Sequence, residues 1–323
     1  MRNRALVLTL SVLLGLVGSC ERAREKPEKE GRITRDETVR IAYVKWSTEI
    51  ASTNLVKAVL QEKLGYHCEI VPMSADEMWE SVASGETDAM VSAWLPGTHE
   101  HFYREYKDRV VDLGPNLTGT QIGLLVPDVS VGRQTGQRGI RHEPYIKADS
   151  IEDLPQYADM FQHHIVGIDP EAGIMKKTRE AIKAYNLGNR YNLVESSEKE
   201  MTGALAEAIG AQKWIVVTGW YPHWMFGRWK LKFLEDPQKV YGGKEHINTI
   251  ARKGLKEDMP DAYMFLDNFN WDPEEMARLM LWIKETDGLY PYEQANRWIK
   301  TNPKKVEKWL SMVEASNKNR GGE

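Results

Sequence analysis

The sequence predicts an α/β protein with two α/β lobes and a ligand cleft between them, and three observations lead to this prediction. Strand-like and helix-like hydrophobic patterns alternate over most of the chain, which is typical of α/β domains. A glycine-rich, polar stretch at 128–150 divides this alternation into two units. The 323-residue chain also contains 11 tryptophans against 6 phenylalanines. Because an indole is large and needs a partner for its N–H, such an excess invites a search for tryptophans that line a ligand cleft.

The N-terminus has the pattern of a bacterial targeting segment. Arg2 and Arg4 precede an apolar run at 5–17, which is too short to span a bilayer as a helix. The run ends in small residues directly before Cys20 and so resembles a lipobox, in which the cysteine becomes the lipidated N-terminus. We therefore expect a lipoprotein signal peptide at 1–19, a lipid anchor at Cys20 and an extracytoplasmic protein attached to a bacterial membrane. The alternative is an ordinary secretory signal followed by a chance cysteine.

Composition restricts the function class of the remaining chain. The formal net charge is −4 and no basic patch is clustered, which argues against a nucleic-acid partner. Eight of the ten residues at 21–30 are charged, so we expect a solvated tether at 20–37. With Cys20 acylated, Cys68 has no partner for a disulfide, and a buried, inert thiol is expected there.

The first predicted unit alternates between the two kinds of element. Its strands are expected at 39–44, 69–72, 88–93 and 122–126, and its helices at 47–64 and 76–83. The second unit has expected strands at 164–168, 191–195 and 214–218, and helices at 173–185 and 199–209. After 244–253 the chain is expected to be helical at 272–284, 293–299 and 304–312. Asp272 and Pro273 are the N-cap and first-turn residues that begin the first of these helices.

These patterns lead to a domain assignment with both ends of the chain in one lobe. Lobe 1 is expected to comprise 38–126 plus about 254–315. Lobe 2 is expected to comprise 127–253, with a long surface insertion at about 128–150.

Three tryptophans lie where predicted strands end. Trp46, Trp94 and Trp220 each follow a hydrophobic, strand-like run. Ligands of open α/β sheets bind at the carboxyl ends of strands, so these three indoles are expected to meet in one cleft. Their electron-rich faces suit a quaternary ammonium cation, with about 2 kcal/mol for each desolvated cation–π contact. The alternative is that each tryptophan is an ordinary core residue.

A second anchor is expected opposite the indoles. Gly173 begins a predicted helix, and the free N–H groups of a first helical turn bind anions. His99, five residues after Trp94, is placed to donate a further hydrogen bond to a carboxylate. A cation box beside a carboxylate site describes a receptor for a zwitterion.

Four segments then resemble one known family, the glycine betaine-binding proteins of osmoprotectant ABC importers. The resemblance is carried by the strings at 42–54, 92–99, 167–175 and 218–224. It implies a type II periplasmic-binding-protein fold, and because the chain has no catalytic, cofactor or metal motif, we expect a binding protein without catalytic activity, cofactor or metal. It also implies an ammonium cage of Trp46, Trp94 and Trp220, with the ligand carboxylate held by Gly173, Ile174 and His99.

The expected function is therefore capture of glycine betaine, by a monomer, for an ABC permease with its ATPase subunits. Three alternatives remain at this point. One is a receptor for choline, carnitine or proline betaine, another is a ligand sensor for a membrane signalling partner, and the third is an enzyme that acts on betaines. No cofactor motif or catalytic motif supports the enzyme, and the two histidines of the 99–101 string face apart on a helix without a third metal ligand.

Overall fold

The computed structural model describes residues 38–134 and 140–320. The predicted signal peptide, the tether and Cys20 lie outside these residues. Within them, no helix has the length and apolar character needed to cross a membrane.

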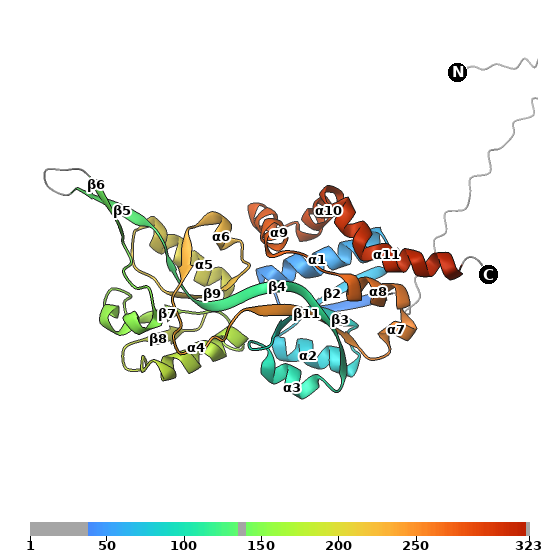
Figure 1. Cartoon of the computed structure of the whole chain (residues 1–323), viewed down its shortest axis with the longest axis horizontal. Helices are drawn as coiled ribbons and strands as arrows, with labels where there is room; N and C mark the ends of the chain where they lie inside the picture. Colours follow the sequence, from blue (N-terminus) through green and yellow to red (C-terminus); the bar gives the residue numbers. More distant parts are fainter. Residues whose placement is uncertain (1–37, 135–139, 321–323) are drawn as a thin grey trace, which may run out of the picture. The chain divides into compact units, whose positions relative to one another are not determined.

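Among the described residues, nine strands form one mixed sheet in the order β2-β1-β3-β11-β4-β9-β7-β8, with β10 paired to β4 (Figure 1). The strands are β1 (Thr38–Tyr43), β2 (His67–Pro72), β3 (Ala89–Leu95), β4 (Val110–Pro127), β7 (His164–Val166), β8 (Asn192–Val194), β9 (Val217–Tyr221), β10 (Leu231–Phe233) and β11 (Glu245–Arg252). Two further strands, β5 (Ser130–Gln134) and β6 (Ile140–Pro144), form a separate antiparallel ribbon. The stretch predicted as a surface insertion therefore contains a hairpin.

The long strand β4 belongs to two parts of the sheet. Its residues 110–120 pair with β11, which also pairs with β3, and β1 lies parallel to β2 and β3. Its residues 121–125 pair with β9, and β9 lies parallel to β7. We call the first group of strands the β1 half and the second group, with β8 and β10, the β9 half. The change of partner occurs between Thr120 and Gln121, where β4 passes from one half to the other.

Helices cover both faces of the β1 half. Helix α1 packs against α9 and α10 on one side of β1 to β3, and α2 packs on β1, β3 and α3 on the other (Figure 1). The helices are α1 (Ser47–Glu62), α2 (Ala75–Ser84), α3 (Glu100–Tyr106), α4 (Gly173–Ala184), α5 (Glu198–Gly210), α6 (Met225–Arg228), α7 (Leu255–Asp258), α8 (Pro260–Asn268), α9 (Pro273–Glu285), α10 (Pro291–Thr301) and α11 (Pro303–Arg320). A 3-10 helix, Ile151–Tyr157, follows β6.

Several predicted elements agree with the structure and two differ in a way that bears on the site. The strand expected at 214–218 is β9 (Val217–Tyr221), so Trp220 lies inside the strand and pairs with Ile122. Trp94 is likewise the last residue but one of β3. The statement that all three tryptophans follow their strands is therefore wrong in detail, since only Trp46 does so. Cys68 is buried as expected, and burial raises the pKa of its thiol to about 12.

Candidate functional site

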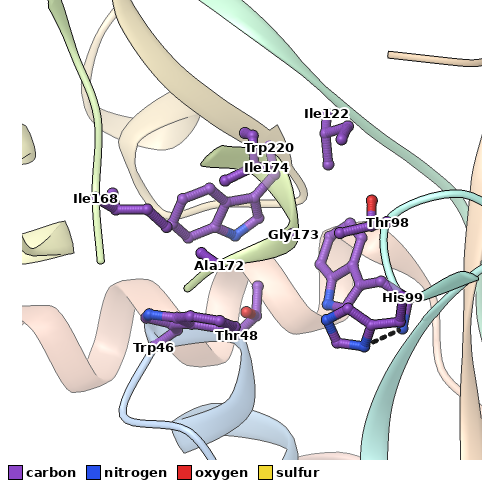
Figure 2. Close-up of a pocket in the computed structure, with 11 residues that line it drawn as sticks. Trp46, Thr48, Thr98, His99, Ile122, Ile168, Ala172, Gly173, Ile174 and Trp220 are labelled. Atoms are coloured by element: carbon purple, nitrogen blue, oxygen red, sulfur yellow. Dashed lines mark hydrogen bonds between the residues drawn. The ribbon is translucent and has the colours of Figure 1, made fainter. Parts of the chain in front are cut away.

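A cavity lies where the β1 half and the β9 half meet, and all six residues predicted to bind the ligand line it (Figure 2). It encloses about 350 Å³ of empty space, part of which is open to solvent. The lining residues are Trp46, Thr48, Trp94, Thr98, His99, Ile122, Ile168, Ala172, Gly173, Ile174 and Trp220. No Asp or Glu is among them, so no carboxylate side chain forms part of this lining.

The three tryptophans reach the cavity from three different segments. Trp46 lies in the turn between β1 and α1, Trp94 near the end of β3, and Trp220 near the end of β9. Their exposed fractions are only 8%, 5% and 4%, so the ring faces are almost completely removed from water. Figure 2 shows the rings of Trp46 and Trp220 on opposite sides of the space between them. This arrangement provides the desolvated aromatic walls that a quaternary ammonium group needs.

Trp46 is held in place by the opposite half. Its indole Nε1 donates a hydrogen bond of 2.8 Å to Oδ2 of Asp169, which follows β7. The indole N–H of Trp220 is buried and has no partner among the described residues. A buried donor without a partner is rare in folded proteins, and this one belongs to a residue that lines the cavity.

His99 is a neutral hydrogen-bond donor in this environment. Burial, aided by the nearby His101, lowers the pKa of His99 to about 3, so the ring carries no charge at neutral pH. Its Nδ1 accepts a hydrogen bond of 3.3 Å from the backbone N–H of Trp94. A neutral imidazole that accepts at Nδ1 carries its proton on Nε2. The dashed line in Figure 2 marks this bond, and the other ring nitrogen faces the cavity.

The beginning of α4 supplies two further donors. The N-cap residue, Ala172, has no side chain able to cap the helix, and the backbone N–H groups of Gly173 and Ile174 form no hydrogen bond to another described residue. Helix N-termini leave such groups unpaired, and the helix dipole adds positive potential there. Unpaired N–H groups of this kind are the donors that helix N-termini offer to anions, and those of Gly173 and Ile174 lie at the wall of the cavity.

Gly173 also lies against the segment that carries His99. A Cβ atom at position 173 would stand 2.5 Å from the carbonyl oxygen of Thr98, which is far inside van der Waals contact. The Thr98 segment is in turn fixed by Glu245, which begins β11. The Glu245 carboxylate accepts from the N–H groups of Gly97 (2.8 Å) and Thr98 (2.7 Å) and from the Thr98 hydroxyl (2.5 Å).

Sequence reasoning missed the remaining lining residues. Thr48, Thr98, Ile168 and Ala172 lie inside the four strings that carried the family resemblance, so their location was available as a signal. Ile122 had no such signal, and it reaches the site because β4 pairs it with Trp220. Among the described residues no group of three or more His, Cys, Asp or Glu side chains is arranged to hold a metal ion.

The fold and this cavity define a class of protein, the bilobal substrate-binding receptors, in which a ligand is enclosed between two α/β halves. The chain belongs to the family described as the substrate binding domain of ABC-type glycine betaine transport systems, which matches residues 37–301. Together with the structural neighbours, this confirms the predicted type II periplasmic-binding-protein fold.

Three similar proteins illustrate the relationship. The glycine betaine/carnitine transport binding protein GbuC of Listeria monocytogenes is 50% identical over 167 residues, which are 51% of this chain and 54% of that protein. The chain thus spans about half the length of this curated relative. Lactococcal OpuAC, solved in a closed conformation with glycine betaine, has a TM-score of 0.75 and 40% identity, with 84% of this chain and 99% of that chain covered. ProX from Borrelia burgdorferi has a TM-score of 0.76 and 36% identity, with 84% and 96% covered.

Proposed function

We propose that this protein captures glycine betaine and delivers it to an ABC permease with its ATPase subunits. The observation that carries the proposal is that one cavity is lined both by three buried indoles and by the hydrogen-bond donors of Gly173, Ile174 and His99. The trimethylammonium group would lie between Trp46, Trp94 and Trp220, and the carboxylate would accept from the two backbone N–H groups and from His99 Nε2. Binding, with no chemical turnover, is the proposed activity.

The polar half of the cavity favours a zwitterion over choline. Choline has a hydroxyl where glycine betaine has a carboxylate, so it cannot accept from all three donors. Each buried donor left without a partner costs about 1–3 kcal/mol. Choline also carries an uncompensated positive charge, and the cavity lining has no Asp or Glu to balance it. Carnitine and proline betaine keep both charged ends, so they are the closer competitors.

The proposed cellular setting follows from the N-terminal sequence. A lipid at Cys20 would hold the receptor outside the cytoplasm, on the periplasmic or outer face of a bacterial membrane, and the charged segment at 20–37 would separate the folded part from that membrane. We propose that the protein acts there as a monomer. The relatives named as transport binding proteins support the transport role over a signalling role.

Isothermal titration calorimetry of the purified protein tests the ligand. We expect glycine betaine to bind at least about 5-fold more tightly than choline, because each unpaired donor costs about 1–3 kcal/mol. Carnitine and proline betaine titrations rank the remaining zwitterions. Choline binding as tight as glycine betaine would reject the assigned carboxylate site, and absence of binding by every one of these ligands would reject the proposed function.

A further inference from the structure

Glu198 lies outside the cavity lining but between two of its walls. It is the first residue of α5 in the β9 half, and only 8% of it is exposed. Its carboxylate accepts from the backbone N–H of Ser47 (2.8 Å), from the Ser47 hydroxyl, and from Nε2 of His223 (3.0 Å). A buried carboxylate with three donors is fully paired, so its charge is tolerated in this position.

Each partner of Glu198 is attached to a different wall of the cage. Ser47 directly follows Trp46 and begins α1 in the β1 half. His223 packs edge-on against Trp220, with ring centroids 4.7 Å apart and an interplanar angle of 89°. One carboxylate therefore connects the Trp46 segment to the Trp220 segment.

The two connections differ in kind. Glu198 and His223 both belong to the stretch between β8 and α6, and the Nδ1 atom of His223 accepts from the N–H of Met225 (3.2 Å). Because Nδ1 is an acceptor, Nε2 carries the proton that His223 donates to Glu198. This bond lies within one half and orients the carboxylate, whereas the bonds from Ser47 cross between the halves.

A second bond crosses at the same place. The indole N–H of Trp224 donates to the Ser47 hydroxyl over 3.2 Å, and Trp224, like Glu198, belongs to the β9 half. The hydroxyl is thus a donor to Glu198 and an acceptor from Trp224. Burial alone would raise the pKa of Glu198, but His223 and Ser47 together hold it below its usual range. The carboxylate is ionised at neutral pH, which strengthens each bond that it accepts.

We propose that Glu198 is a positioning residue. Its hydrogen bonds with Ser47 and His223, which we call the clasp, hold the Trp46 and Trp220 walls together and stabilise the closed cage. The inference rests on the proposed function, because it concerns how the ligand-ready arrangement is held. The crossing bonds do not involve the ligand, so they raise the population of the closed form before binding. Apparent affinity is proportional to the population of the competent form, so loss of the clasp weakens binding without removing any ligand contact.

The variant Glu198→Gln tests the clasp, since its amide nitrogen replaces one acceptor with a donor. We expect glycine betaine affinity to fall about 10-fold to 100-fold, which is the usual range for loss of hydrogen bonds to a charged group. Glu207→Gln, an exposed change on the same helix, is the matched control and should bind like the wild type. Ser47→Ala removes the hydroxyl from the other side of the clasp and should weaken binding in the same direction.

A double-variant cycle separates positioning from simple support of the fold. If the two side chains act through one contact, Ser47→Ala should weaken binding less in the presence of Glu198→Gln than it does alone, because only the bond from Trp224 to the Ser47 hydroxyl is then left to lose. The ligand-free melting temperature of Glu198→Gln should stay close to that of Glu207→Gln. Unchanged affinity in Glu198→Gln, or full additivity of the two changes, would overturn the proposal. If Glu198→Gln does not fold, normal binding by Ser47→Ala would overturn it equally. Wild-type protein is titrated first, and failure at that step counts against the proposed function and not against the clasp.

Discussion

Trp94 is the cage residue whose replacement disturbs the rest of the protein least. Trp46 is bonded to Asp169 and Trp220 packs on His223, whereas the contact of Trp94 with His99 runs through its backbone N–H and survives a change of side chain. The indole of Trp94 therefore serves mainly as a wall of the cavity.

We expect Trp94→Ala to weaken glycine betaine binding by about 2 kcal/mol, or about 30-fold, since one desolvated cation–π contact is lost. Titration calorimetry measures the affinity, and circular dichroism checks that the fold is intact. Trp282→Ala on α9 is a suitable control, because Trp282 is partly exposed and does not line the cavity. Equal affinity of Trp94→Ala and the control would remove Trp94 from the proposed cage.

The residues of the candidate site were predictable because their chemistry is local. An indole near a strand end and a glycine at a helix start are each visible within a few residues of sequence. The partners that hold them were not predictable in this way. Asp169 lies 123 residues from Trp46 and Glu198 lies 151 residues from Ser47, so nothing in either local pattern indicates the pairing. Such contacts depend on how the two halves of the sheet meet.

At the scale of elements, regular hydrophobic patterns were informative and interrupted ones were not. Helix α1 begins at Ser47 as expected and ends two residues before the predicted end at 64. Strand β4 was expected only at 122–126, although it extends from Val110 to Pro127. Gly114 and Gly119 interrupt its pattern with positive φ angles of 85° and 82°, close to irregularities in the β4–β11 register. Glycines at such bulges resemble turn signals in a sequence. For this reason the part of β4 before residue 122 was not predicted as a strand.

The start of α4 provides a test at this scale. Gly173→Ala leaves the backbone conformation allowed, but the new Cβ atom would meet the Thr98 carbonyl oxygen at 2.5 Å across the cavity wall. Forced overpacking typically costs about 1–3 kcal/mol, so we expect about 5-fold to 100-fold weaker binding of glycine betaine. The helix itself should remain, because alanine favours helical structure more than glycine does.

Gly203→Ala on α5 is the matched control, since no atom lies within 4 Å of its added Cβ. We expect this variant to bind like the wild type and to melt at the same or a slightly higher temperature. If Gly173→Ala also binds like the wild type, the close approach of Thr98 to α4 is not required for binding.

At the scale of the whole molecule, two buried groups near the site link its stability to pH in opposite directions. Glu49 is fully buried in α1, and its Oε2 accepts a hydrogen bond of 2.6 Å from the backbone N–H of Val44. Burial raises the pKa of Glu49 from 4.5 to about 8. The stabilisation from this group is therefore complete below about pH 4.5 and is lost as pH rises through 8. For His99, with a pKa lowered to about 3, stability is instead lost as pH falls from about 6.5 towards 3.

The variant Glu49→Gln isolates the first of these effects, because an amide imitates the protonated acid and does not titrate. Between pH 6 and pH 8 the folded wild type retains a proton on Glu49 that the unfolded chain has released, and each pH unit changes the free energy of unfolding by about 1.4 kcal/mol. We expect the wild type to lose about 2–3 kcal/mol relative to Glu49→Gln over this interval, as measured by urea unfolding at several pH values. Contributions from His99 and from surface groups are common to both proteins and cancel in the difference. Parallel stability curves for the two proteins would mean that Glu49 is ionised in the folded state, and the turn that carries Trp46 would then contain a buried negative charge.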